Sequence, residues 1–105
     1  FIEPDLIVDI KAIDGLSEIR ETAEGFSIGA AVSCALMGES AALKREWPGV
    51  VEAAKLIGSK QVQGRCTITG NLCNASPAAD SVPALVAAGA MALIAGPAGR
   101  RTVAV

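Results

Sequence analysis

Short apolar runs separated by polar residues predict alternating strands and helices along the first third of the chain. Residues 6–10 form a largely β-branched run, which predicts a buried strand. From Asp14 the apolar positions follow helical spacing as far as Gly25, which predicts a short helix with an N-cap and a C-terminal stop. Residues 26–30 alternate as a strand does. The two expected strands are either separated by the helix or paired as neighbours.

The middle of the chain has the start and stop signals of three helices. Ser33 and Ser40 each precede an apolar-periodic stretch, and serine is a favoured N-cap. Pro48 suits the first turn of a third helix, whose apolar residues lie on one face as far as Ile57. Gly58 is expected to end this helix.

The last third of the chain predicts one helix followed by a hairpin. Asp80 is a candidate N-cap for a helix over residues 81–88, and Gly89 is its expected stop. Residues 91–95 and 102–105 are predicted strands around a turn rich in glycine and proline.

Composition narrows the class of protein. A chain of 105 residues with 51% apolar residues suits one domain with one core over residues 1–105. The net charge is −2 and no basic cluster occurs, which argues against nucleic acid as a partner. Residues 81–99 carry no charge, but Pro83 and Gly89 interrupt them, so a buried helix followed by a strand explains this stretch better than a membrane span.

Cysteine usage bears on compartment and on metal binding. Three cysteines, an odd number at wide spacing, favour reduced thiols in a cytoplasmic protein. Cys66 and Cys73 are interpreted as small core residues. With no histidine and no Cys-x-x-Cys pair, the sequence predicts no metal site. The chain begins with Phe1 and shows no targeting signal, and the expectation is therefore a piece of a longer protein or a processed subunit.

Residues 58–80 carry most of the information about function. They are rich in small and hydroxyl-bearing residues, and no acid occurs between Glu52 and Asp80. Backbone N–H groups and short side chains in such a stretch can approach an anion closely, and Asp80 adds an acceptor for hydroxyl groups. The combination favours a ligand with phosphate and sugar parts. In the simpler interpretation the glycines only make turns, Asp80 only caps a helix and Asn71 only forms a turn.

A catalytic side chain is not predicted. No serine or cysteine has a recognisable activating partner, and histidine is absent. A nicotinamide-nucleotide domain is also disfavoured, because no Gly-x-Gly-x-x-Gly turn follows a strand.

The same segment resembles a motif of FAD-binding subunits and domains of molybdenum hydroxylases, the family of xanthine dehydrogenase and the carbon monoxide dehydrogenase medium subunit. The motif is similar to G-S-x-Q-I-R-N-x-A-T-I-G-G-N-L-x-x-A-S-P-x-x-D, followed by an alanine-rich helix. Residues 4–10 and 28–30 are also similar, so the resemblance covers nearly the whole chain. The matching positions, in order, are Gly58, Ser59, Gln61, Thr67, Ile68, Gly70, Asn71, Leu72, Ala75, Ser76, Pro77 and Asp80.

The resemblance implies an α+β fold, a small β-sheet flanked by helices that forms the second lobe of a PCMH-type FAD-binding domain. The family's N-terminal and C-terminal lobes have no counterpart in this sequence. The implied function is an oxidoreductase module that is not catalytic alone. Its FAD takes electrons from 2Fe-2S clusters and passes them to NAD or another acceptor. The implied partners are a large subunit with the molybdenum cofactor and a small 2Fe-2S subunit.

The resemblance also implies a set of FAD-binding residues. Those expected at the diphosphate and the ribityl chain are Thr67, Ile68, Thr69, Gly70 and Asn71. Asp80 is expected to accept hydrogen bonds from ribose or flavin-chain hydroxyls. Ile57 is expected to be an apolar neighbour of the cofactor.

One difference between this sequence and the family motif bears on which of two functions is expected. Thr69 stands where the family has the first glycine of Gly-Gly, and a β-branched residue disfavours a positive φ and a close backbone approach. Its hydroxyl can compensate as a donor. The alternative to an electron-transfer module is therefore a scaffold domain that has lost flavin binding, and Thr69→Gly is the variant that separates the two.

Overall fold

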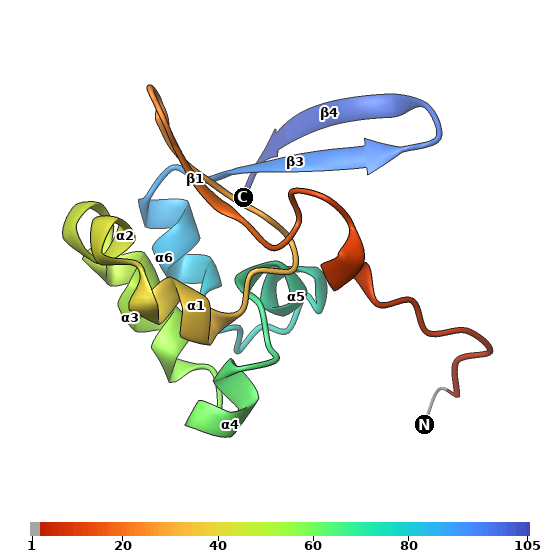
Figure 1. The fold of residues 1–105 in the computed structure, drawn as a ribbon, viewed down its shortest axis with the longest axis horizontal. Coiled ribbons are helices and arrows are strands. Elements are labelled where there is room, and N and C mark those ends of the chain that lie inside the picture. The colour runs from red at the N-terminus through yellow and green to blue at the C-terminus, as the bar shows by residue number, and fades with distance from the viewer. Residues whose placement is uncertain (1–2) are drawn as a thin grey trace.

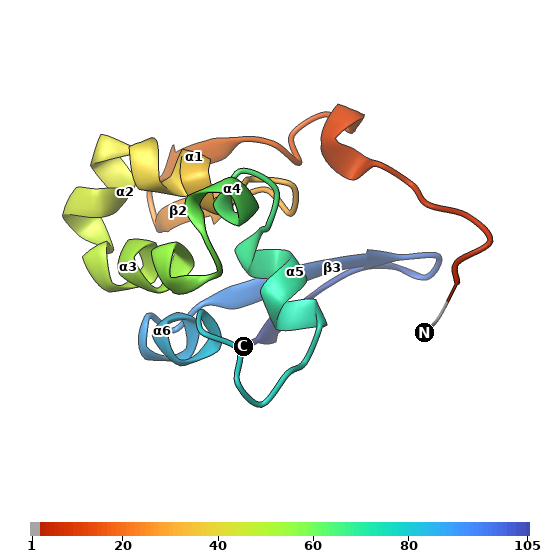
Figure 2. The same ribbon diagram turned by 90° about the horizontal axis from the view of Figure 1, so that it is seen from below.

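A computed structural model describes residues 3–105 and shows a cluster of short helices from which two β-hairpins extend (Figure 1). Residues 1 and 2, which include the non-methionine start at Phe1, lie outside the described residues. Figure 2 shows the first three α-helices and the last one gathered on one side of the molecule. The helices are α1 (Cys34–Glu39), α2 (Ala41–Glu46), α3 (Pro48–Leu56), α4 (Lys60–Gln63), α5 (Ile68–Cys73) and α6 (Val82–Ala87).

The strands form two separate antiparallel pairs. β1 (Ile19–Thr22) pairs with β2 (Gly25–Ile28), and β3 (Met91–Gly96) pairs with β4 (Gly99–Ala104). In each pair a two-residue loop joins neighbouring strands, the connection typical of a hairpin. The predicted α+β class is confirmed, with its strands divided between two small sheets. The hairpin predicted near the C-terminus is confirmed; β3 ends one residue later than expected, and β4 covers residues 99–104 where 102–105 was expected.

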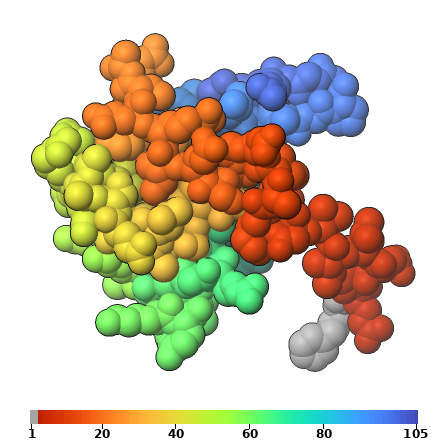
Figure 3. Space-filling view, in the orientation of Figure 1, coloured from red at the N-terminus to blue at the C-terminus, as the bar shows by residue number. Residues whose placement is uncertain are grey.

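The strand predicted at residues 6–10 is wrong. Leu6 and Ile7 are 78% and 83% exposed, and no strand pairs with this segment within residues 3–105. A β-branched run has strand propensity, but a strand also needs a neighbour for its backbone hydrogen bonds. The segment leaves the body of the molecule in the space-filling view (Figure 3).

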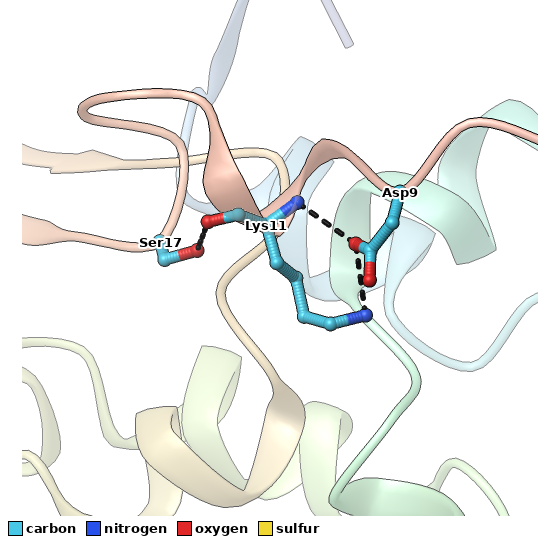
Figure 4. Close-up of polar contacts among 3 residues, drawn as sticks. All are labelled: Asp9, Lys11 and Ser17. Carbon is cyan, nitrogen blue, oxygen red and sulfur yellow. Dashed lines mark hydrogen bonds and ion pairs between the residues drawn. The ribbon is translucent and has the colours of Figure 1, made fainter.

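A short 3₁₀ helix, η1 (Ile10–Ala12), follows the extended segment. The Asp9 carboxylate accepts a hydrogen bond from the Lys11 backbone N–H at 3.0 Å and pairs with Lys11 Nζ at 3.0 Å (Figure 4). Ser17 Oγ donates a hydrogen bond to the Lys11 carbonyl at 3.1 Å, and this bond stabilises the turn after η1. These bonds to Lys11 lower the pKa of Asp9 below its usual value.

The helix predicted between Asp14 and Gly25 is also wrong, because this stretch forms β1 and the turn into β2. Gly25 has a φ of 137°, which glycine adopts without steric cost, and it starts β2 directly after the turn. Pairing of Ile19 with Ile28 then places both half-buried side chains against the core. The strand predicted at residues 26–30 is confirmed over Gly25–Ile28.

The helices predicted in the middle of the chain are confirmed with their caps. Ser33 Oγ accepts from the Leu36 N–H at 3.1 Å, and Ser40 Oγ accepts from the Leu43 N–H at 3.2 Å. Pro48 is the first residue of α3, where its missing N–H costs no helical hydrogen bond. Gly58, with a φ of 61°, turns the chain after α3.

One core joins the helices and receives the base of each hairpin. α1 and α3 pack against each other, and α6 packs on α3. Half-buried residues of β1 and β2, together with Val105, cover the edge of this core. Within residues 3–105, no helix combines the length and apolarity needed to cross a bilayer. The buried core residues are Val32, Cys34, Met37, Leu43, Val50, Val51, Ala54, Ile68 and Leu85.

Candidate functional site

Residues 58–80, in which the glycines suggested turns, contain two short helices. Ser59 Oγ caps α4 through a 3.4 Å bond from the Val62 N–H. Gln63 Nε2 donates to the Lys55 carbonyl at 2.6 Å and to the Gly58 carbonyl at 3.4 Å. The Gln63 side chain therefore holds one carbonyl in the last turn of α3 and one just after that helix, and α4 is fixed against the end of α3.

Thr67 is the N-cap of α5. Its Oγ1 accepts a hydrogen bond from the Gly70 N–H at 2.8 Å, and its backbone is extended, with a φ of −127° and a ψ of 153°. The N–H groups of Ile68 and Thr69 belong to the first turn, where a helix supplies no backbone acceptor. A Cβ at Gly70 would lie 3.1 Å from Thr67 Oγ1, so glycine keeps the cap compact. The start of α5 thus presents backbone donors next to two threonine hydroxyls.

The structure answers one of the two expectations about Thr69, the one that concerns its backbone conformation. This residue is helical, and Ala75 is the one non-glycine residue within positions 3–105 that has a positive φ. The expectation that position 69 requires a positive φ is therefore wrong, and threonine fits it without backbone strain. Thr69 is half-buried, and its hydroxyl is available as a donor.

Asn71 connects α5 to the start of α6. Its Oδ1 accepts two hydrogen bonds from Ser81, one from the backbone N–H at 3.2 Å and one from Oγ at 2.6 Å. Ser81 is 1% exposed, so both donors would be buried without a partner if Asn71 were removed. The turn-forming interpretation of Asn71 is wrong, since the residue lies within a helix. Sequence reasoning missed Ser81, because the bond joins residues ten positions apart.

Asp80 lies beside this link but does not cap α6. The N-cap is Ser81, whose side chain makes no capping bond, and Pro83 in the first turn has no N–H to offer a cap. Asp80 is exposed, and within residues 3–105 its carboxylate takes part in no hydrogen bond or ion pair. The predicted cap is therefore wrong, and the carboxylate remains available to accept hydrogen bonds.

Ile57 lies at the other border of the segment. It is the C-cap residue of α3, is half-buried, and packs against the core cluster that includes Ile68 of α5. Ile57 and the first residue of α5 therefore pack on the same core. The Asn71–Ser81 hydrogen bonds hold Ser81, and with it the adjacent residue Asp80, beside the middle of α5. Of the predicted residues, only Thr67 to Asn71 are contiguous, as the N-cap and the first four residues of α5.

The three cysteines have different environments, and none forms a disulfide within residues 3–105. The Cys34 N–H donates to the Cys66 carbonyl at 2.9 Å. Burial, with a hydrogen bond to the Cys66 thiol, raises the pKa of Cys34 to about 12, so its thiol stays protonated at neutral pH. Cys66 packs against the core as predicted, whereas Cys73 is exposed and the core interpretation is wrong for it. No cluster of three His, Cys, Asp or Glu residues suited to a metal occurs within the described part of the chain.

Comparison with known proteins gives consistent similarities. Residues 1–105 match the protein family described as the FAD binding domain in molybdopterin dehydrogenase. The carbon monoxide dehydrogenase medium chain of Hydrogenophaga pseudoflava is 36% identical over 103 residues, which are 98% of this chain and 36% of that protein. The glyceraldehyde dehydrogenase medium chain of Sulfolobus acidocaldarius is 31% identical over 102 residues, 97% of this chain and 36% of that protein.

Solved structures agree with the sequence comparison. A carbon monoxide dehydrogenase from Hydrogenophaga pseudoflava that lacks the Mo-pyranopterin moiety superposes with a TM-score of 0.80 at 36% identity, over 85% of this chain and 31% of that one. A reconstituted CO dehydrogenase from Oligotropha carboxidovorans gives a TM-score of 0.80 at 32% identity, with the same coverage. The chain spans about a third of the length of these relatives.

Proposed function

The chain belongs to the family of FAD-binding domains in molybdopterin dehydrogenases, and from this membership we propose that it carries electrons through FAD inside a molybdenum hydroxylase. When bound, the flavin supplies the redox chemistry. The side chains of this chain bind and orient it, and none acts as a general acid, general base or nucleophile. Residues 1–105 form one FAD-binding subdomain in this proposal.

The donor set of residues 67–80 fits a ligand with a diphosphate and hydroxyl groups. The first-turn N–H groups of α5 and the hydroxyls of Thr67 and Thr69 supply donors for phosphate oxygens. Asp80 supplies an acceptor for ribose or ribityl hydroxyls, and Ile57 an apolar contact. The pair of Asn71–Ser81 hydrogen bonds carries the proposal, because it holds Asp80 beside α5.

The proposal extends to the rest of the complex. Electrons reach the flavin from 2Fe-2S clusters on a small subunit, which receive them from a molybdenum cofactor on a large subunit, and leave to NAD or another acceptor. The relatives named medium chain, and one named as the alpha subunit of the 6-hydroxypseudooxynicotine dehydrogenase complex, support a multi-subunit assembly. The reduced state of all three cysteines suits a cytoplasmic complex.

The scaffold alternative rested on two grounds, Thr69 and the family's N-terminal lobe having no counterpart in this sequence. The helical conformation of Thr69 weakens the first of them. An electron-transfer module is therefore preferred to a domain without flavin.

The test is the FAD content of the protein purified with its partner subunits. We expect stoichiometric FAD in the unchanged protein and, in Asp80→Ala, an FAD dissociation constant raised roughly tenfold or more by the loss of charged-acceptor hydrogen bonds. Glu52→Ala removes an exposed carboxylate on α3, outside the segment, and is expected to leave FAD binding unchanged. A folded, colourless unchanged protein would contradict flavin binding, and equal affinity in both variants would contradict the role of Asp80.

A further inference from the structure

An open hollow of about 410 Å³ lies between the β1–β2 hairpin and the junction of α1 with α2, away from residues 67–80. The elements that line it form the orange and yellow parts of the surface in Figure 3. Its wall is mainly apolar, and two carboxylates border it. The apolar side chains are Ile19, Phe26, Leu36 and Ala42, and the acids are Glu21 and Glu39.

The apolar wall is more exposed than helix packing requires. Leu36 is 41% exposed on α1, although its neighbour Met37 is fully buried in the core. Phe26 and Ile19 reach the hollow from β2 and β1 while also touching the edge of the core. This arrangement leaves apolar surface in contact with water at one place between two elements, which favours covering by another molecule.

The charge of the hollow specifies what would cover it. Within residues 3–105, neither Glu21 nor Glu39 takes part in an ion pair. Arg45 interacts electrostatically with Glu21 at longer range, but its guanidinium is held by Glu46 at 2.8 Å. Two unpaired carboxylates beside an apolar wall complement a side chain with an aliphatic stem and a cationic end. Arginine fits best, because its planar guanidinium binds carboxylates through paired hydrogen bonds and is weakly hydrated.

The shape favours a protein segment over a small molecule. Sites for small ligands enclose most of the ligand and lie between about 300 and 1,000 Å³. The volume of this hollow falls within that range, but the hollow is open to solvent and would leave much of a small ligand uncovered. Several relatives are named as medium chains or complex subunits, so other chains are present in those assemblies.

We propose that the hollow between β1–β2 and α1–α2 is an interaction surface that receives an arginine-bearing segment of a partner subunit. The apolar wall contacts the aliphatic stem, and Glu21 and Glu39 bind the guanidinium. The proposal rests on the complex put forward under Proposed function, but the hollow shares no residue with the candidate flavin site. FAD content and subunit association therefore report on the two proposals separately.

The experiment compares the association of the complete FAD subunit with its partner subunits in two charge-matched variants. Glu21→Lys with Glu39→Lys reverses both acids of the hollow, and we expect the dissociation constant to rise roughly tenfold or more. Glu24→Lys with Glu52→Lys makes the same change in net charge at exposed acids outside the hollow, with less than about a twofold effect expected. Added salt is expected to weaken association of the unchanged subunit and to narrow the difference between the variants.

Two further measurements complete the test: association of a variant that changes only apolar contact, and the FAD content and melting temperature of every variant. Leu36→Gln removes apolar contact without adding charge, and we expect it to weaken association while the salt dependence stays that of the unchanged subunit. FAD content and melting temperature are expected to stay the same in all three variants. Unchanged association in the hollow variants would overturn the proposal. A fall in melting temperature, which would indicate that the hollow is covered within its own subunit, or a change in self-association alone would also overturn it.

Discussion

At the scale of single residues, one side-chain oxygen does most to connect the candidate site to the rest of the fold. Asn71 Oδ1 receives both hydrogen bonds that Ser81 donates. Ser81 is buried, so these donors cannot exchange their partner for water. An asparagine in a glycine-rich segment therefore serves to order the segment, and it fixes Ser81, the residue that follows Asp80.

The first prediction concerns this link. Asn71→Ala leaves two buried donors unpaired and is expected to lower the free energy of unfolding by about 2–3 kcal/mol. Asn74→Ala is the matched control, because Asn74 is exposed at the end of the same helix, and its effect is expected to stay within about 0.5 kcal/mol. Urea unfolding of the two variants measures the difference. Equal stabilities would show that Ser81 finds other partners when Asn71 is absent.

At the scale of helices and strands, the glycines of this chain have opposite roles that the sequence alone does not separate. Gly58 has a φ of 61°, and a Cβ there would lie 2.9 Å from Val62 Cγ1. Gly49 lies in the first turn of α3, and a Cβ there meets no atom within 4 Å. The first glycine is required to end α3, whereas the second only raises the conformational entropy of the unfolded chain.

This contrast gives the second prediction, a pair of substitutions with opposite signs. Gly58→Ala is expected to lower the free energy of unfolding by about 1 kcal/mol or more, because alanine is strained at a positive φ and clashes with Val62. Gly49→Ala is expected to raise it by about 0.4–1 kcal/mol, because alanine has the higher helix propensity. Thermal and urea unfolding measure both changes. A stabilised Gly58→Ala variant would contradict the assigned turn.

An element could be predicted from the sequence when the residues that determine it lie within or next to that element. Ser33, Ser40 and Pro48 act within one turn of their own helix, and the helices they start were predicted with their caps. Residues 6–10 and 14–25 were predicted wrongly because strand formation depends on a pairing partner that local propensity does not reveal. The site residues were found through the resemblance. Their arrangement was not predictable, since the helical state of Thr69 and the Asn71–Ser81 link depend on tertiary packing.

At the scale of the whole molecule, the two hairpins are anchored differently. β1 and β2 place Ile19, Phe26 and Ile28 against the helical core. β3 and β4 extend away from the helices (Figure 1), and the apolar side chain of Leu93 is 67% exposed. At the base of this second hairpin, a hydrogen bond from the Val105 N–H to the Ala90 carbonyl, 3.1 Å long, holds the chain to the body. Every residue of β4 is exposed, so few contacts outside the hairpin oppose its separation into single strands.

The last prediction follows from this difference in anchoring. An isolated two-stranded hairpin is marginally stable in water, so β3 and β4 are expected to open without the helices. In hydrogen exchange on the 105-residue chain, amides in the centre of β3 and β4 should exchange at least about tenfold faster than those of α3, whose Ala54 is fully buried. β1 and β2 provide the internal control, since they pair in the same antiparallel way but pack on the core, and their paired amides should be better protected than those of β3 and β4. Equal protection in α3 and in both hairpins would mean that the second hairpin opens only when the entire molecule unfolds.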